Sequence, residues 1–525
     1  MEVTNNERDI SSCTTAADIN GGALSLLPPE ILVNIFSFFS DSVKDLLLCA
    51  QVNQTWHHII TSFYIWRTVK FNKFETFSRF HEILQLITKT RRNRALDNWS
   101  RFVKAYLNVI KSPISRTSEE EYEEEEEKDV GAQISFTKPT YFYSTKFYGY
   151  FVKKLDLSRI HRKNLITEEM LRDLFPNIPN LENVNFYNCY TVTDRVIEKL
   201  TKSCHHLKKL KLFGCTSLTN RSLYWIEMRC SKLTTLNIGF CVIITPNALQ
   251  SLVNRCKELT SLTISHCLNT RAISLIPMVK NLQGLRKLYM YSSFTSDLIV
   301  KNIISQIPSL RKLDLGISNP KLTDEATNII SRHCPNLVYL SLSFSLITRL
   351  GLRTIGRGCR KLLFIDLSGC YLIDDEISDF LSYCPRLKII YLNYLLQISG
   401  KSFLSIIKSS QIEYASFTSS KILEVSSSID LLPPSSNEER SCSKIRKLVL
   451  DNCEISDKNL KQISYWCKNL EYLDISLVYD MDDRVLQDLC DRLENLKEVI
   501  AKNCYGVSVA MQDNLSKHQR IKFTF

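Results

Sequence analysis

One six-residue pattern recurs along most of this chain: an apolar residue, two others, an apolar residue, one other and a final apolar residue. Clear copies run from Leu207 to Leu212, from Leu233 to Ile238 and from Leu310 to Leu315. The copies begin at positions 181, 207, 233, 259, 285, 310, 337, 362, 387, 445, 470 and 496, with a degraded copy at 412. Because the usual step is 25 to 27 residues, each copy is predicted to be one unit stacked on the next.

Each unit is predicted to hold a short strand and a helix. Alternation within the pattern turns the first apolar residue, and those three and five positions later, toward the interior. A Thr, Ser or Asp then introduces an amphipathic stretch, as at Arg195–Cys204 and Glu325–Cys334. These features predict an α/β fold, a leucine-rich-repeat solenoid with a parallel inner sheet and outer helices, over residues 151–525. A Ser- and Pro-rich interval predicts a loop at 419–444.

The cysteines follow the repeat. Of the 18 in the chain, seven stand eight positions after the first apolar residue and seven stand three positions before it. The first set is Cys189, Cys215, Cys241, Cys267, Cys370, Cys453 and Cys504, and the second is Cys204, Cys230, Cys256, Cys334, Cys359, Cys384 and Cys467. Since no close Cys-x-x-Cys pair occurs, we expect reduced thiols buried as small apolar groups with a weak S–H donor, and no metal site.

The N-terminal part differs in composition. Residues 1–22 are polar and are predicted to be a disordered tail, and residues 23–70 form a compact apolar block. Residues 71–150 are predicted to be a helical linker with an acidic loop at 112–140. Within the apolar block, Pro28 and Pro29 suit the start of a helix with an apolar stripe. A block this small cannot bury all of its apolar side chains, so part of the stripe is expected to remain available to a partner.

The apolar block resembles an F-box. The resemblance rests on the segment LPPEILVNIF at 27–36, on DLLLCAQVNQTW at 45–56 and on Trp66. Together with the cysteine-bearing repeats, the chain resembles the F-box/leucine-rich-repeat proteins. This resemblance implies docking onto the small adaptor protein of SCF-type cullin-RING ubiquitin ligases, and through it onto a cullin scaffold. The residues that would face the adaptor are Leu27, Pro28, Ile31, Leu32, Ile35, Phe36, Leu46 and Val52. The alternative is that they pack against the first repeats.

The opposite face of each strand is predicted to hold a substrate. Positions two, four and six after the first apolar residue point to the concave side, where lysines gather in the first half and aromatic residues recur. We expect an acidic or phosphorylated protein segment to bind there. The candidate residues are Lys209, Lys211, Phe213, Lys287, Tyr289, Tyr291, Lys312 and Tyr339. The alternative is a merely solvated basic face.

Charge patterning adds one further hypothesis. The net charge is +12, although residues 119–127 hold eight Glu around Tyr122. This acidic run is either a solvated spacer or a segment that occupies the basic face and competes with substrate. Lys and Arg lack the clustering of a backbone-tracking groove, so nucleic acid is an unlikely partner by this criterion.

Several function classes are disfavoured. The sequence contains no Gly-rich phosphate loop, no nucleophile elbow and no His-Glu-x-x-His motif, so we expect neither an enzyme nor a cofactor. No apolar run is long enough to predict a membrane helix, and the N-terminus lacks the pattern of a signal peptide. Together with these absences, the resemblance to the F-box/leucine-rich-repeat proteins implies a substrate receptor in the cytoplasm or nucleus. The alternatives are an F-box scaffold without ubiquitin transfer and a nucleic-acid-associated repair factor.

Overall fold

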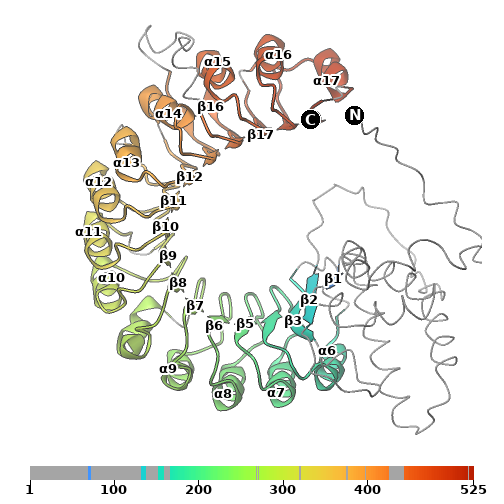
Figure 1. Cartoon of the computed structure of the whole chain (residues 1–525), viewed down its shortest axis with the longest axis vertical. Coiled ribbons are helices and arrows are strands. Elements are labelled where there is room, and N and C mark those ends of the chain that lie inside the picture. Colours follow the sequence, from blue (N-terminus) through green and yellow to red (C-terminus); the bar gives the residue numbers. More distant parts are fainter. Residues whose placement is uncertain are drawn as a thin grey trace, which may run out of the picture. The chain divides into compact units, whose positions relative to one another are not determined.

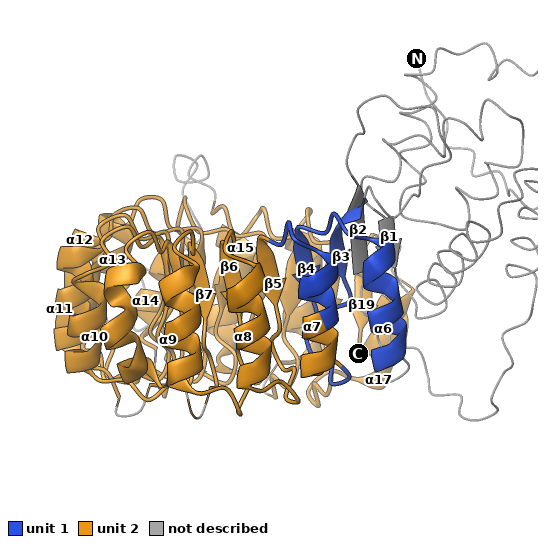
Figure 2. Ribbon diagram, turned by 90° about the horizontal axis from the view of Figure 1, so that it is seen from below, with its two compact units in different colours: residues 1–191, 199–207 blue, residues 192–198, 208–525 orange. Residues whose placement is uncertain are grey.

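The computed structural model describes residues 152–158 and 166–525, apart from 268, 270, 319–320, 374–376, 397, 425–442, 480 and 518–519, together with the backbone of two earlier strands. These strands are β1 (Val69–Phe71) and β2 (Ala132–Phe136). The chain divides into two compact units, residues 1–191 with 199–207 and residues 192–198 with 208–525 (Figure 2). Apart from β1 and β2, the predicted tail, F-box and helical linker lie outside the described residues.

The first unit contains strands of both orientations. β1 pairs antiparallel with β2, β2 pairs antiparallel with β3 (Val152–Asp156), and β3 pairs in parallel with β4 (Asn183–Asn185). Between β3 and β4 lie α6 (Glu168–Leu174) and the 3₁₀ helix η6 (Phe175–Asn177). β2 falls inside the predicted acidic loop at 112–140. The sequence A-Q-I-S-F alternates apolar and polar residues, which explains a strand there.

In the second unit, parallel strands line the inner side of a curved array of repeats (Figure 1). Each strand pairs in register with the next, from β5 to β13, then directly with β15, β17, β18 and β19. The strands are β5 (Lys209–Lys211), β6 (Thr235–Asn237), β7 (Ser261–Thr263), β8 (Lys287–Tyr289), β9 (Lys312–Asp314), β10 (Tyr339–Ser341), β11 (Phe364–Asp366), β12 (Ile389–Tyr391), β13 (Tyr414–Ser416), β15 (Lys447–Val449), β17 (Tyr472–Asp474), β18 (Glu498–Ile500) and β19 (Lys522–Thr524). The predicted parallel inner sheet is confirmed.

The helices lie on the outer side of this array (Figure 1). They are α7 (Asp194–Ser203), which is divided between the units, α8 (Asn220–Arg229), α9 (Pro246–Arg255), α10 (Asp297–Ile304), α11 (Asp324–His333), α12 (Arg349–Gly358), α13 (Ile377–Tyr383), α14 (Gly400–Ile407), α15 (Asp457–Trp466), α16 (Asp483–Arg492) and α17 (Val509–Ser516). One repeat has the 3₁₀ helix η7 (Ala272–Asn281) instead, with Pro277 inside it. Proline lacks the N–H of a regular helix, so it disfavours an α-helix at this place.

The repeat pattern places the core. In the repeat that starts at Leu310, the side chains of Leu310, Leu313 and Leu315 are fully buried between the sheet and the helices. The equivalent leucines and isoleucines of the other repeats are buried as well. The fold is therefore the predicted leucine-rich-repeat solenoid. Among the described residues, no helix has the length and apolar character needed to cross a bilayer.

The chain between β13 and β15 takes a longer step than elsewhere. The predicted loop at 419–444 includes strand β14 (Lys421–Ile422), which pairs in parallel with β16 (Glu454–Ile455), while residues 425–442 lie outside the described part. Despite the 33-residue step from Ile412 to Ile445, β13 pairs with β15 in the same register as the other strands. The inner sheet is thus continuous across this interval.

Helix starts are linked from one repeat to the next. Thr219 caps α8 by accepting a hydrogen bond from the N–H of Arg221, and Asp194, the first residue of α7, accepts two hydrogen bonds from Thr219. The backbone N–H of Thr219 donates to Oδ1 at 3.0 Å and its hydroxyl donates to Oδ2 at 2.6 Å. Asp297 holds Thr323 in the same way. We call this series of acid-to-cap contacts the cap ladder.

The cysteines behave as predicted. All fourteen at the two repeat phases are reduced and buried. Most of those after the strand donate an S–H to a carbonyl of the preceding repeat, as in Cys241 to Leu212 at 3.2 Å and Cys504 to Ile475 at 3.0 Å. The thiol therefore satisfies a buried carbonyl that would otherwise lack a donor.

One backbone position is left-handed in each of the thirteen repeats that begin between 181 and 496. The residue seven positions after the first apolar residue has φ between 50° and 72°. Glycine occupies this position only at Gly214 and Gly369, whereas bulky residues such as Ile317 (φ 50°) and Phe344 (φ 61°) occupy it elsewhere. A β-branched residue is strained in this conformation, so the turn after each strand is imposed by packing rather than by local preference.

Candidate interaction face

The inner face of the second unit presents two rows of side chains. In β5, β8 and β9 the central leucine of the strand is buried while the residues on either side are half-buried or exposed. We call the residues two positions after the first apolar residue the first row and those four positions after it the second row. Because neighbouring strands pair in register, each row runs straight across the strands.

The four predicted lysines lie close enough to repel one another. Lys287 and Lys312 are direct neighbours in the first row, on β8 and β9, and Lys209 and Lys211 stand on β5. Burial lowers the pKa of Lys287, and the positive charges of Lys312, Lys209 and Lys211 lower it further. Among the ion pairs between described residues, none includes any of these lysines. We call this group the basic patch.

The predicted aromatic residues divide into two groups. Tyr289 and Tyr339 contact each other across β9, with ring centroids 6.1 Å apart. Phe213 belongs to a separate run at the strand exits, where it lies 6.1 Å from Phe240. Tyr291 continues that run through His266, at 5.2 Å. Of the four predicted aromatic residues, Tyr289 and Tyr339 therefore lie beside the second row of β9 to β11, whereas Phe213 and Tyr291 do not.

Sequence reasoning missed how far the aromatic contacts continue. The ring of Tyr339 stacks on that of Phe364 at 4.1 Å and 9°, and Phe364 lies 5.4 Å from Tyr391. Tyr391 in turn lies 5.1 Å from Tyr414 on β13. These residues occupy the two predicted face positions, where aromatic residues were expected to recur, but the sequence did not show that their rings contact one another.

A pair of carboxylates stands beside these rings in the second row. Asp314 on β9 and Asp366 on β11 flank Ser341 on β10, whose hydroxyl donates to Asp366 Oδ2 at 3.1 Å. Asp314 accepts the backbone N–H of Gly316 at 3.1 Å. Burial, and then the charge of Asp366, raises the pKa of Asp314 to about 6. The inner face is thus basic at β5 to β9 and acidic at β9 to β11.

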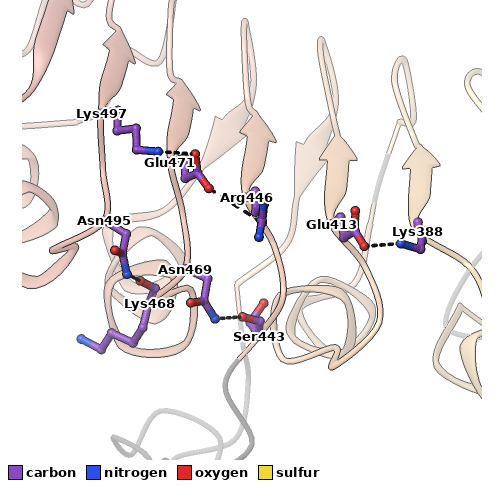
Figure 3. Close-up of polar contacts among 9 residues, drawn as sticks. All are labelled: Lys388, Glu413, Ser443, Arg446, Lys468, Asn469, Glu471, Asn495 and Lys497. Carbon is purple, nitrogen blue, oxygen red and sulfur yellow. Dashed lines mark hydrogen bonds and ion pairs between the residues drawn. The ribbon is translucent and has the colours of Figure 1, made fainter. Parts of the chain in front are cut away.

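A polar ladder borders the entry ends of β13 to β18 (Figure 3). Glu471 bridges Arg446 at 3.7 Å and Lys497 at 2.7 Å, and Lys388 pairs with Glu413 at 2.5 Å. A groove at this edge is lined by Glu413, Lys444, Arg446, Asn469, Glu471, Asn495 and Lys497. Asn469 and Asn495 each donate to a backbone carbonyl of the preceding repeat, Ser443 and Lys468. Opposite charges offset each other here, so this groove joins repeats and is a weaker candidate for binding.

The predicted adaptor-facing residues and the acidic run at 119–127 lie outside the described residues. Their assignment is therefore a prediction from sequence alone.

Two family profiles match the chain. The profile described as F-box-like matches residues 24–72, and the profile described as Leucine Rich repeat matches residues 229–253, which run from the end of α8 into α9. The F-box protein SKIP1 of Arabidopsis thaliana is 28% identical over 190 residues. The chain combines an F-box-like segment with leucine-rich repeats. The SKIP1 match covers 35% of this chain and 57% of SKIP1.

Solved structures match the chain at lower sequence identity. The yeast Rad7 and Elc1 complex contains a chain that matches 69% of this F-box/leucine-rich-repeat protein and 84% of its own length, at 20% identity and a TM-score of 0.41. An internalin of Listeria monocytogenes matches 69% of this chain and 89% of its own, at 18% identity and a TM-score of 0.37.

Proposed function

We propose that this F-box/leucine-rich-repeat protein is the substrate-recognition subunit of an SCF-type ubiquitin ligase in the cytoplasm or nucleus. Its F-box binds the adaptor, and through it a cullin, while the inner face of the repeats holds an acidic or phosphorylated protein segment. F-box/leucine-rich-repeat proteins are typically non-catalytic. The contribution of such a chain is to hold the substrate near the site of transfer, which raises the effective concentration of its reacting group.

The proposed binding of an acidic substrate rests on the basic patch. Four ammonium groups face the inner side without a described anionic partner, and after burial the charges of the other three contribute to the lowered pKa of Lys287. An acidic or phosphorylated segment relieves that repulsion on binding. Lysine provides point charges with little geometric selectivity, so neighbouring rings such as Tyr289 supply the shape.

Charge reversal tests this assignment. The variant Lys209→Glu, Lys211→Glu, Lys287→Glu and Lys312→Glu is expected to bind a fluorescein-labelled phosphoserine- and glutamate-rich peptide at least about tenfold more weakly than the wild type at low salt. The matched control reverses four exposed lysines on the helix side, Lys257, Lys301, Lys401 and Lys461. Equal weakening by both variants would show that only net charge matters and would reject the basic patch.

The adaptor part has its own test. Replacing Leu27, Ile31 and Ile35 by Asp should abolish co-purification with an SCF adaptor while leaving peptide binding by the repeats unchanged. Retained adaptor binding would contradict the F-box assignment. A bound protein whose half-life is the same with the wild type and with this variant would favour a scaffold without ubiquitin transfer.

A further inference from the structure

A ring-lined acidic site lies next to the basic patch on the inner face. Its floor is the second row of β9 to β11, where Asp314, Ser341 and Asp366 stand side by side. Aromatic side chains border this row at both ends and along the first row. The bordering residues are Tyr289, Tyr339, Phe364 and Tyr391. We call these seven residues the acidic cage.

No basic residue in the described part of the chain forms an ion pair with the two carboxylates of the cage. Among the described ion pairs none includes Asp314 or Asp366, and Lys312 Nζ lies over the ring of Tyr339, 5.7 Å from its centroid. Burial and the charge of Asp366 raise the pKa of Asp314, which favours its protonated form. An unrelieved pair of like charges costs folding free energy, which a cationic ligand would recover.

The floor of the cage also contains an unsatisfied hydroxyl. Ser343, two residues beyond the end of β10, is only 2% exposed, and its Oγ has no hydrogen-bond partner among the described residues. It borders Gly316, where an added Cβ would collide with Ser343 Oγ and stand 2.9 Å from the ring of Tyr291. Because Gly316 has no side chain, no Cβ occupies the space beside this buried hydroxyl and the adjacent carboxylate of Asp314.

From this geometry we infer that the acidic cage binds a cationic side chain, the guanidinium of arginine or the ammonium of lysine, belonging to the protein segment held on the inner face. The carboxylates accept its N–H groups, the hydroxyl of Ser343 accepts a further one, and the ring faces attract its charge. The inference rests on the proposed substrate-holding role and narrows the substrate class to segments that carry acidic residues and one basic residue.

Strand spacing sets the expected distance between the acidic residues and the basic residue of the bound segment. Neighbouring strands lie about 4.8 Å apart, so β8 in the basic patch and β10 at the centre of the cage are separated by roughly 10 Å. An extended peptide spans that distance in about three residues. The recognised segment is therefore expected to place its basic residue about three positions beyond its acidic run.

Three labelled peptides and the full-length chain test the inference. Each peptide has four glutamates followed, three positions later, by arginine, lysine or glutamine. The arginine or the lysine peptide is expected to bind about tenfold more tightly than the glutamine peptide, and comparing the two identifies the preferred cation. General attraction by a chain of net charge +12 works in the opposite direction, so this preference needs a local acidic site.

Two matched variants locate the effect. Asp314→Asn with Asp366→Asn should bind all three peptides equally, whereas Asp451→Asn with Asp474→Asn changes the same charge on the same face outside the cage and should keep the preference. Equal binding of the three peptides to the wild type, or an intact preference after the first double substitution, overturns the cage while leaving the basic patch standing. Failure of every peptide to bind overturns the proposed function as well.

Discussion

The carboxylate of Asp324 holds Thr348 of the following repeat through two hydrogen bonds. Oδ1 accepts the backbone N–H of Thr348 at 2.9 Å, and Oδ2 accepts its hydroxyl at 2.6 Å. Thr348 is in turn the N-cap of α12 and accepts the N–H of Leu350 at 3.2 Å. One acid therefore fixes the cap of the next helix, and the contact belongs to the cap ladder.

Removing this acid should destabilise the solenoid. Asp324→Ala leaves the N–H of Thr348 without its acceptor, so we expect a loss of about 1–2 kcal/mol in the free energy of unfolding, measured by urea titration. Asp513→Ala, at an exposed position of α17, is the control and should change stability by less than about 0.5 kcal/mol. A similar loss in both variants would contradict the role of the cap ladder.

The left-handed position offers a stabilising substitution. Ile317 has φ 50° and is 38% exposed, so glycine there would relieve strain and give up little buried surface. We expect Ile317→Gly to raise the free energy of unfolding by about 1 kcal/mol. Leu350→Gly, an exposed apolar position within α12, should instead lower it by about 1 kcal/mol. Losses in both variants would show that the left-handed turn stores no strain.

The buried thiols should resist alkylation. Burial raises the pKa of Cys230 and of Cys359 to about 12, so little thiolate exists at pH 8 and the reagent cannot reach it. Peptide mapping after iodoacetamide treatment should find the fourteen repeat cysteines unmodified in the native chain and modified in denaturant. Rapid native modification of any of them would mean that its repeat opens.

Asp314 should make stability depend on pH. Its pKa is about 6 in the folded chain, above the ordinary carboxyl value of 3.8. A carboxyl whose pKa is raised by folding favours the folded state while protonated, and this contribution disappears as the pH rises from about 4 through 6. Asp314→Asn keeps an oxygen acceptor for Gly316 without the charge.

The free energy of unfolding of Asp314→Asn is therefore expected to exceed that of the wild type by about 2 kcal/mol at pH 7.5 and to equal it near pH 4. Urea unfolding at the two pH values measures the difference. An equal gain at both values would mean that the charge of Asp314 is not what limits stability.

The period of the apolar residues was sufficient to predict the solenoid, the two cysteine phases and the outward rows that contain Lys209 and Lys287. It could not predict the cap ladder, because Asp324 and its partner Thr348 are separated by a whole repeat and each is an ordinary helix-start residue alone. The left-handed turn was also missed. Glycine marks it only at Gly214 and Gly369, and the bulky residues elsewhere give no local signal.

The candidate site was predicted in part. The basic patch followed from residue positions, since burial and charge could be inferred from the repeat alone. The acidic cage needed the register that places Asp314, Ser341 and Asp366 in one line. The F-box residues, such as Ile31, could be assigned only through resemblance and a family profile, because they lie outside the described part of the chain.

The sheet is continuous across the longer step after β13, so the length of this connection does not alter the spacing of side chains on the inner face. The cost of closing a longer connection grows only with the logarithm of its length, so added residues there are inexpensive. Tyr414 and Lys447 remain register partners even though they are 33 positions apart in the sequence. Homologues can therefore gain or lose sequence at this interval, or an engineer can insert a reporter there, while a bound protein meets the same spacing of side chains.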